Sequence, residues 1–431
     1  MPQCRLVVVR IKWRQNAQES TGASRNYSSI VNPRFTNRNT QVPIDSTVKS
    51  FTESVSRIMN LNWRSDLQYT MPSHTTYPWM WLWDSCFHAI IYATLGDERA
   101  LMEANSVFLW QSTNGMVPHM GYQADVEFGQ AAWRGRGAST FTQPPMYGHM
   151  LRVLYEQGFN VESLVDQATA GIRFILRERR FETGLVHIVH PWDSGTDDSP
   201  RWDPWCPEGT GAPEWRIQKD RLVNSLDVNV HGSAVSNHLF SVAPASFNAL
   251  VAFNAFEIAE VTNDSTLREE AIDLAEVLDH YFVDDLTTWA DTGPDGQVTS
   301  SVRTLDALLP ALVSSRGDRV EEVLRMTIDS NAFGAPFGPS GVDQRESQFD
   351  ADAYWRGAAW PQLTYLFFIA ASRAGLLDVR DTLADNAVRA AVHSDFAEYL
   401  NPITGVGHGA SPQSWACLPI VMLAANGERR G

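Results

Sequence analysis

The chain has 431 residues, of which 44% are hydrophobic and 19% charged, and its formal net charge at pH 7 is −16. This composition is typical of a globular protein with a large core. It argues against nucleic-acid binding, because a phosphate-binding surface must be basic. No run approaches the roughly eighteen consecutive apolar residues of a membrane span, so we expect no membrane partner.

Cysteine and histidine usage argues against a metal site or a disulfide framework. The four cysteines, Cys4, Cys86, Cys206 and Cys417, form no CxxC pair, and the eleven histidines show no HExxH spacing. We therefore expect no metal and no cofactor, and a reduced compartment. The acidic, lysine-poor composition fits a high-salt habitat and a GC-rich genome equally well.

The first 45 residues differ in composition from the rest of the chain. They are rich in Asn, Ser, Thr and Gln, and no amphipathic period persists in them. This pattern predicts a poorly ordered N-terminal extension over residues 1–45. Their apolar run, LVVV, is too short for the apolar region of an export signal, so we expect a cytoplasmic protein.

From about residue 46 onward a helical period dominates the sequence. The first segment, IDSTVKSFTESVSRIMNL, has apolar residues on one face: Val48, Phe51, Val55, Ile58 and Met59. Eleven further helical stretches are predicted at 85–96, 98–111, 145–157, 161–179, 244–262, 264–283, 303–314, 317–328, 354–374, 378–396 and 413–425. Asp264 is a suitable N-cap for the stretch that follows it.

Twelve helical segments with mostly short connections predict an all-α fold of about six helical hairpins. Helical hairpins stack as an open solenoid or close into a ring, and the periodicity does not decide between these architectures. No repeat of the TPR or ankyrin type is visible, which weighs mildly toward a closed ring.

Residues 184–241 interrupt the helical pattern with many Gly, Pro and Trp residues. An irregular stretch of this length is usually functional or disordered. Disorder is the weaker alternative, because four tryptophans would be costly to leave in water: Trp192, Trp202, Trp205 and Trp215. The stretch includes HPWDSGTDDSPRWD (190–203), in which four aspartates fall within eleven residues. We therefore predict a functional role for it.

Three other stretches combine carboxylates with aromatic rings: YPWMWLWDSCFH (77–88), ADAYWRGAAWPQ (351–362) and FAEYLNPITG (396–405). Carbohydrate sites use this mixture, because sugar C–H faces lie on aromatic rings while polar side chains bond the hydroxyls. Hydrolysis of a glycosidic bond needs two carboxyl groups, one protonated and one ionised. By local chemistry alone the candidates are Asp84, Asp193, Asp197 and Glu398, and spacing does not rank them.

These stretches also carry a family resemblance. SGTDDSPRWD (194–203) closely resembles the SGxDxSPRWD motif of mannosylglycerate and glucosylglycerate hydrolases in glycoside hydrolase family 63, and the more distant trehalases share a related element. WLWDSCFHA (81–89), TQPP (142–145), YWRGAAWP (354–361), AEYLNPITG (397–405) and PQSW (412–415) resemble the family's other motifs, in the same order. The resemblance covers residues 46 to about 425. It implies an (α/α)6 barrel catalytic domain over 46–431 and an inverting mechanism.

The resemblance also implies roles for individual residues. Asp197 matches the family's general acid, and Glu398 matches its general base. The substrate-binding residues expected from the motifs are Tyr77, Trp81, Trp83, Asp84, Gln143, Trp192, Gly195, Arg201, Tyr354, Trp355, Arg356, Gln413 and Trp415. Of these, Tyr354 and Gln413 match positions near the aglycone, which is the part of the substrate that leaves.

Some of these assignments have alternatives. Trp81 and Trp83 are two residues apart and cannot share a helix face, so we expect one to face the sugar and the other to pack in the core. Arg356 fits a sugar contact and a buried ion pair equally well. Asp198 and Asp203 are expected to bond protein groups or solvent rather than to catalyse.

One departure from the family bears on the substrate. Close relatives read WESGMDNSPRWD where this chain reads WDSGTDDSPRWD, so Asp198 replaces an asparagine. An extra negative charge there would disfavour an anionic aglycone such as glycerate and would favour a neutral disaccharide or glucoside.

The predicted function is the hydrolysis of a small α-glucoside or α-mannoside of the glucosylglycerate or mannosylglycerate kind. The alternatives are a trehalase-like or other disaccharide α-glucosidase, a sugar epimerase on the same barrel, and a non-hydrolytic sugar-binding protein. The expected partner is a small carbohydrate, and formation of a homo-oligomer is left open.

Overall fold

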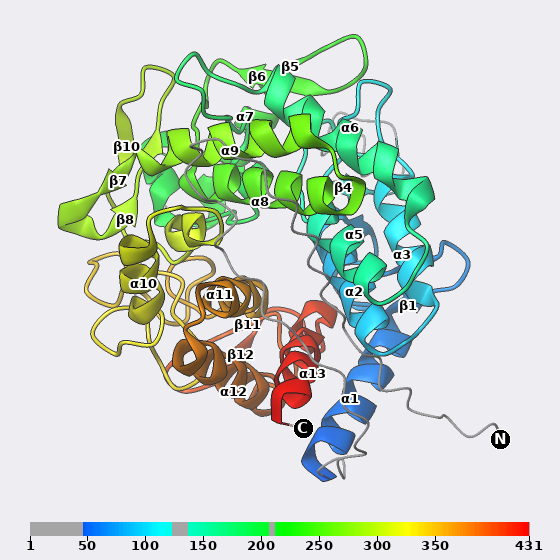
Figure 1. The fold of residues 1–431 in the computed structure, drawn as a ribbon. Coiled ribbons are helices and arrows are strands. Elements are labelled where there is room, and N and C mark those ends of the chain that lie inside the picture. The colour runs from blue at the N-terminus through cyan, green and yellow to red at the C-terminus, as the bar shows by residue number, and fades with distance from the viewer. Residues whose placement is uncertain (1–45, 123–136, 207–211, 431) are drawn as a thin grey trace, which may run out of the picture.

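A computed structural model describes residues 46–122, 137–206 and 212–430, so the predicted extension over residues 1–45 lies outside the described residues. The described part is mostly helical, in agreement with the sequence prediction (Figure 1). Its α-helices are α1 Ser46–Asn62, α2 Leu82–Thr94, α3 Arg99–Phe108, α5 Tyr147–Glu156, α6 Glu162–Glu178, α7 Ala212–Asn224, α8 Ala245–Thr262, α9 Ser265–Asp279, α10 Gly317–Met326, α11 Pro361–Ala374, α12 Leu377–His393 and α13 Pro419–Arg430. Its 3₁₀ helices are η2 Pro191–Ser194, η3 Pro200–Trp205, η4 Asp284–Leu286, η5 Asp306–Leu312 and η6 Ser414–Cys417.

Six of these elements contact one another in a cycle. Helix α2 packs against α5, α5 against α8, α8 against η5, η5 against α11, α11 against α13, and α13 against α2. The elements between them in the chain pack on the cycle: α3 on α2, α6 on α5, α9 on α8, α10 on η5, α12 on α11 and α1 on α13. Figure 1 shows these helices arranged around a common centre. The cycle favours a closed ring over an open solenoid.

The described strands are short antiparallel pairs in the connections. They are β1 Trp63–Arg64 with β2 Tyr69–Thr70, β3 Met80–Trp81 with β4 Met120–Gly121, β5 Leu226–Val228 with β6 Ala234–Asn237, β7 Phe282–Val283 with β8 Thr288–Trp289, β9 Asp291–Thr292 with β10 Val298–Ser300, and β11 Tyr399–Leu400 with β12 Gly407–His408. Two of these strands carry or adjoin candidate site residues. Trp81 lies on β3, and Glu398 immediately precedes β11.

Local sequence signals set several helix boundaries. The carboxylate of Asp264 accepts the backbone N–H of Leu267 at 3.0 Å, which confirms the predicted N-cap of α9. The predicted helix 354–374 begins only at Pro361, because the residue before a proline is held in an extended conformation and Trp355 has a φ of +59°. The predicted helix 303–314 is the 3₁₀ helix η5, with Pro310 inside it removing a backbone donor.

The prediction that residues 184–241 are irregular was wrong in part. This segment contains the 3₁₀ helices η2 and η3, helix α7 and the β5–β6 hairpin. Helix α7 was not predicted, because few of its residues face the core. Trp215, Leu222 and Val223 are among those that do. The segment is therefore an ordered connection between α6 and α8.

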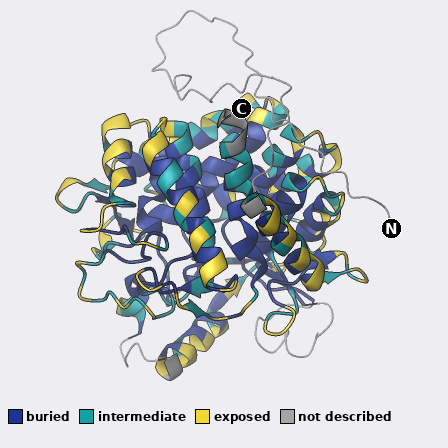
Figure 2. Ribbon diagram, turned by 90° about the horizontal axis from the view of Figure 1, so that it is seen from below, coloured by how far each residue is buried: buried dark blue, intermediate teal, exposed yellow. Residues whose placement is uncertain are grey.

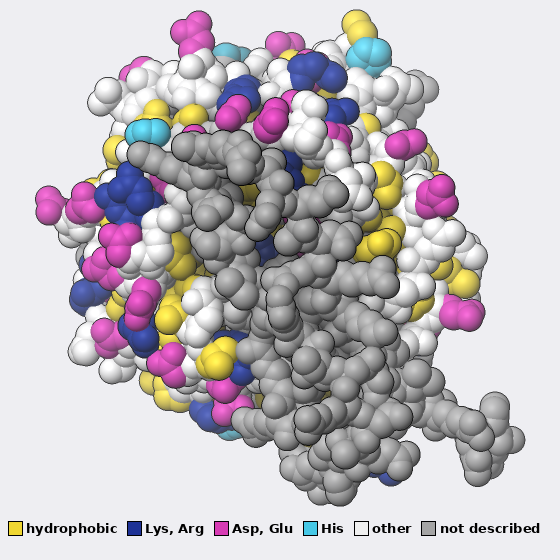
Figure 3. Space-filling view, in the orientation of Figure 1, with side chains coloured by type: hydrophobic (Ala, Val, Ile, Leu, Met, Phe, Trp, Pro, Cys, Tyr) yellow, Lys and Arg dark blue, Asp and Glu magenta, His cyan; other side chains and the backbone are white. Residues whose placement is uncertain are grey.

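The core lies between the elements of the cycle and the helices packed on them, because buried apolar residues of both sets belong to one cluster. Helix α8 is buried along nearly its whole length, as expected for a helix packed on several sides, whereas exposed residues lie on the periphery (Figure 2). On the face shown in Figure 3, acidic and basic side chains of the described residues are interspersed. Within the described residues, no helix is both long and apolar enough to cross a lipid bilayer.

Candidate active site

Glu398 is a buried carboxylate held by two hydrogen-bond donors. The hydroxyl of Tyr77 lies 3.2 Å from both carboxylate oxygens, and the backbone N–H of Ala410 donates to Oε2 at 2.9 Å. Burial raises the pKa of Glu398 to about 7, and the two hydrogen bonds oppose this rise. Gly409 has a φ of +70° and lies directly against Glu398. A Cβ at position 409 would be 2.9 Å from the Cβ of Glu398. The backbone thus fixes this carboxylate in place.

Asp197 is the second carboxyl group of the site. It lies between η2 and η3, and burial raises its pKa to about 7. The negative charges of Asp198 and Glu398 also raise this pKa, whereas Lys219 and a hydrogen bond with Tyr354 lower it. Tyr354, whose hydrogen bond lowers the pKa of Asp197, packs against Tyr399, the neighbour of Glu398, with ring centroids 5.3 Å apart, so the two motifs lie close together.

Asp84 is a third carboxyl group of the same site. It lies in the first turn of α2 and is 3% exposed. Its pKa is well above the ordinary range, chiefly because it is buried and next because Glu398 is negatively charged, with Asp197 adding to the effect. Three carboxyl groups that repel one another cannot all be ionised near neutral pH. Burial and mutual repulsion thus favour protonated carboxyl groups in this site.

Asp193 has a structural position. Its carboxylate accepts the backbone N–H groups of Thr142 at 3.0 Å and Val189 at 2.8 Å, and it pairs with Arg179 at 3.2 Å. These partners tie the turn before Asp197 to the rest of the fold. Asp193 was one of the four carboxyl groups that local chemistry indicated as candidate catalysts. Its carboxylate is instead bonded to these structural partners.

Gly195 and Trp83 explain why this turn contains a glycine. Gly195 has a φ of +71°, and a Cβ there would lie 2.7 Å from the indole of Trp83. Any side chain at this position would displace either the turn or the indole. The glycine therefore allows the turn that carries Asp197 to approach α2.

Arg201 supports the same turn through ion pairs. Its side chain is 1% exposed, bonds Asp291 at 2.9 and 2.7 Å, and also pairs with Asp306. A weaker hydrogen bond at 3.4 Å reaches the hydroxyl of Thr196, next to Asp197. The contacts of Arg201 are thus with protein groups that support the turn. A contact between Arg201 and a sugar stays a prediction.

Arg356 and Asp203 form an ion pair, with Nη1 of Arg356 at 3.1 Å from the carboxylate. The structure thus contains an ion pair of Arg356, partly exposed rather than buried, and contact of Arg356 with a sugar stays a prediction. The prediction that Asp203 bonds a protein group is confirmed.

Indole rings surround the carboxyl groups. Trp355 stacks in parallel on Trp360 with ring centroids 3.6 Å apart, and Trp83 lies 6.5 Å from Trp355. Trp415 meets Trp83 edge-on at 5.8 Å, and its Nε1 donates to the backbone oxygen of Glu398 at 2.9 Å. These rings form a continuous wall beside Glu398.

Trp81 and Trp83 differ in burial, as predicted. Trp83 is 3% exposed and packs in the core, whereas Trp81 is half-buried and meets the ring of Tyr77 edge-on at 6.1 Å. The contact of Trp81 with a sugar stays a prediction. Trp192 lies on η2 with its ring stacked on Phe141 at 6.2 Å.

Several buried polar atoms have no hydrogen-bond partner among the described residues: Trp81 Nε1, Trp355 Nε1, Gln413 Oε1 and both amide atoms of Gln362. Gln143 bonds only weakly, accepting the backbone N–H of Trp83 at 3.5 Å. Buried polar groups in native proteins normally have a partner, so a polyhydroxylated ligand would suit these atoms. Gln362 was not among the predicted residues, although it ends the ADAYWRGAAWPQ stretch.

The sequence interpretation of Asp198 needs correction. Its carboxylate accepts a hydrogen bond from the ammonium of Lys219 at 2.6 Å, so its charge is compensated. Lys219 lies on α7 and was overlooked, because nothing in its sequence context indicates the partner. The argument that Asp198 disfavours an anionic aglycone therefore fails.

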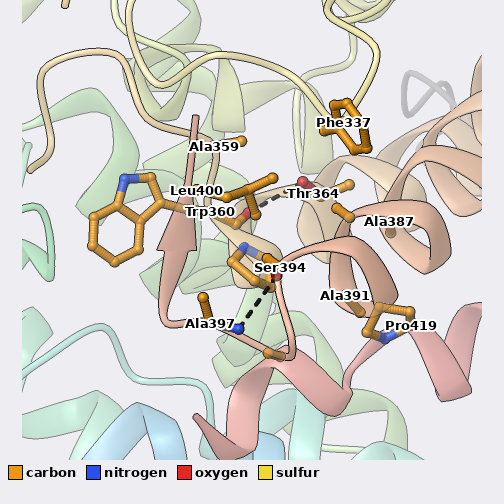
Figure 4. A pocket seen from close by; sticks show the side chains of 13 residues that line it. Phe337, Ala359, Trp360, Thr364, Ala387, Ala391, Ser394, Ala397, Leu400 and Pro419 are labelled. Atoms are coloured by element: carbon orange, nitrogen blue, oxygen red, sulfur yellow. Dashed lines mark hydrogen bonds between the residues drawn. The ribbon is translucent and has the colours of Figure 1, made fainter. Parts of the chain in front are cut away.

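A small cavity shares Trp360 with the indole wall but is lined by none of the three carboxyl groups. It measures about 10 Å³, close to the least volume that can hold one water molecule, and lies among α11, α12, β11 and α13. Its lining side chains, most of them labelled in Figure 4, carry no charge. Among the described residues, no group of three or more His, Cys, Asp and Glu side chains is arranged to hold a metal ion.

The chain is similar in sequence to known glycoside hydrolases. A family model described as the mannosylglycerate hydrolase MGH1-like glycoside hydrolase domain matches residues 77–416. The chain is 26% identical over 407 residues to a glucosylglycerate hydrolase of Mycolicibacterium hassiacum, covering 80% of this chain and 91% of that protein. It is 27% identical over 403 residues to a mannosylglycerate hydrolase of Thermus thermophilus, covering 81% and 94%.

The fold has a counterpart among solved structures. The family 63 mannosylglycerate hydrolase from Thermus thermophilus, crystallised with Tris and D-glycerate, superposes with a TM-score of 0.76 at 22% identity, covering 86% of this chain and 99% of that one. The family match spans most of the chain and includes both carboxyl groups. The protein therefore belongs to the mannosylglycerate hydrolase-like glycoside hydrolases of family 63.

Proposed function

We propose that this protein is an inverting α-glycosidase that hydrolyses a small α-glucoside or α-mannoside, of the glucosylglycerate or mannosylglycerate kind. Its relatives, named for these two activities, support the substrate class. We further propose that residues 46–431 form one (α/α)6 barrel catalytic domain in a cytoplasmic enzyme. The cycle of helix contacts supports the barrel.

One observation carries the mechanism: Asp197 and Glu398 are both buried carboxyl groups, and burial raises the pKa of each to about 7. Two donors, the Tyr77 hydroxyl and the Ala410 N–H, favour the ionised form of Glu398. Burial and, next to it, the negative charges of Asp198 and Glu398 favour the protonated form of Asp197, against the opposing charge of Lys219. This asymmetry suits Asp197 as the acid and Glu398 as the base.

In the proposed step Asp197 gives its proton to the glycosidic oxygen as the bond to the anomeric carbon breaks. Glu398 removes a proton from a water molecule, whose oxygen attacks the anomeric carbon from the opposite face. The products are the alcohol and the sugar with inverted anomeric configuration. The carboxylates exchange their protonation states, and solvent restores them.

Other predicted residues would bind the sugar. Asp84, whose pKa is raised by burial and by the charge of Glu398, would in its protonated form donate a hydrogen bond to a hydroxyl group. The partnerless atoms of Trp355, Gln413 and Gln362 would take further hydroxyls, and the indole wall would pack on C–H faces.

The test is hydrolysis of a panel of glucosylglycerate, mannosylglycerate, trehalose, kojibiose and aryl α-glucosides, with NMR of the newly released anomer. We expect glucosylglycerate or mannosylglycerate to give the highest kcat/KM and to release the β-anomer first. Initial release of the α-anomer would contradict inversion. Faster turnover of trehalose or kojibiose would move the enzyme to the disaccharide class.

The pH dependence of kcat/KM is expected to be bell-shaped with its maximum near pH 7. Activity falls at acid pH as Glu398 gains a proton and at alkaline pH as Asp197 loses one, and burial raises the pKa of both to about 7. Rates measured from pH 4 to 10 at constant ionic strength check this. An optimum at pH 4–5 would show that neither pKa is raised in the working enzyme.

A further inference from the structure

Lys219 is one of only three lysines in the chain, and its side chain is 11% exposed. Its Nζ lies 2.6 Å from Asp198 Oδ1, 5.4 Å from the ring centroid of Trp192 and 5.9 Å from that of Trp215. A cation held between indole rings and a carboxylate has a defined position. Helix α7, which carries Lys219, is further joined to the active-site segment because His190 Nε2 lies 3.1 Å from the backbone oxygen of Lys219.

If Asp197 is the general acid, this ion pair lies on the leaving-group side of the scissile bond. The general acid must be within hydrogen-bond reach of the glycosidic oxygen, and Asp198 is the next residue after Asp197. Of the charged groups that act on Asp197, Lys219 has the strongest influence. In a glyceric acid linked through its 2-hydroxyl group, the carboxylate is attached to the carbon that bears that oxygen. The carboxylate of such an aglycone would therefore lie close to the ion pair.

We propose that Lys219 is a specificity-determining residue that selects leaving groups bearing a carboxylate. It acts in two ways: it cancels the negative charge of Asp198, and it presents further N–H donors, since an ammonium has three and one bonds Asp198. The proposal rests on the proposed function, because it requires Asp197 to protonate the leaving group.

The matched substrates for the test are glucosylglycerate and glucosylglycerol, which differ only in a carboxylate against a hydroxymethyl group. The quantity is the ratio of their kcat/KM values, glucosylglycerate over glucosylglycerol. In Lys219→Met, Asp198 would face the aglycone as an unpaired anion, and we expect this ratio to fall by tenfold or more. In Asp198→Asn the ammonium is uncompensated, and the ratio should rise severalfold. Turnover of glucosylglycerol in the same variant serves as the control for folding.

A ratio that stays within twofold of the wild-type value in Lys219→Met would overturn the proposal. If that variant does not fold, the double variant Asp198→Asn/Lys219→Met removes both charges together. We expect it to have a lower ratio than Asp198→Asn alone, and an equal ratio would overturn the proposal.

Calorimetric titration with D-glycerate and with glycerol gives the same comparison without turnover. We expect the wild type to prefer glycerate and Lys219→Met to lose that preference. Glycerate binding that depends on Lys219 in an enzyme that hydrolyses none of the panel would refute the proposed function but support the role of Lys219. Glycerate binding unchanged by the substitution would refute that role alone.

Discussion

Asp197→Asn is expected to lower kcat on glucosylglycerate by about 10²–10⁴-fold, because an amide cannot transfer a proton to the leaving oxygen. An alkoxide is a poor leaving group and needs that proton, whereas a nitrophenolate needs little help. The variant should therefore keep much more of its activity on a nitrophenyl α-glucoside. Measuring kcat on both substrates tests the role, and an equal loss on both would contradict it.

Heat stability separates loss of catalysis from loss of fold in this variant. A carboxyl group whose pKa is raised to about 7 on folding binds its proton more tightly in the folded state, so it lowers stability as the pH rises from about 4 to about 7. An asparagine at position 197 removes that penalty. We expect Asp197→Asn to have a Tm at pH 8 no lower than that of the wild type. A drop of more than about 5 °C would indicate that the substitution disturbs the fold.

The helical part of the fold was predictable because apolar residues recur at the helical period and because local caps such as Asp264 mark the boundaries. The boundary at Pro361 was misplaced, since the apolar period continues through Tyr354 and Trp355 although their backbone is not helical. The cyclic arrangement was not predictable from periodicity, because it depends on contacts between α2 and α13, which are far apart in the chain.

The candidate site was predictable to the extent that its residues lie in recognisable motifs. The charge of Glu398 raises the pKa of Asp197, and the catalytic roles that the motifs imply for the two carboxyl groups stay predictions. Lys219 was missed because its partner, Asp198, is 21 residues away in the sequence and no local pattern indicates an ion pair. Gln362 was missed because an amide becomes notable only once its burial and lack of partners are known. Arg201 shows the converse, since a motif residue can serve the turn that carries the acid.

Glu398→Gln is expected to lower kcat by about 10²–10⁴-fold on every substrate, including the nitrophenyl glucoside. The base acts on the attacking water, so a better leaving group does not replace it. This pattern is the opposite of the one expected for Asp197→Asn, and the two variants assayed side by side distinguish the two roles. Recovery of Glu398→Gln on the nitrophenyl substrate would mean that Glu398 is not the base.

Azide provides a positive test of the same assignment. It is a nucleophile that needs no deprotonation, so it should attack the anomeric carbon in Glu398→Gln from the face that water uses, while Asp197 still protonates the leaving oxygen. The expected product from an α-glucoside is the β-glucosyl azide, identified by NMR. The carboxylate of Glu398, fixed by Tyr77 and Ala410, marks the face from which azide would attack. An α-glucosyl azide would instead indicate a covalent intermediate and a retaining enzyme.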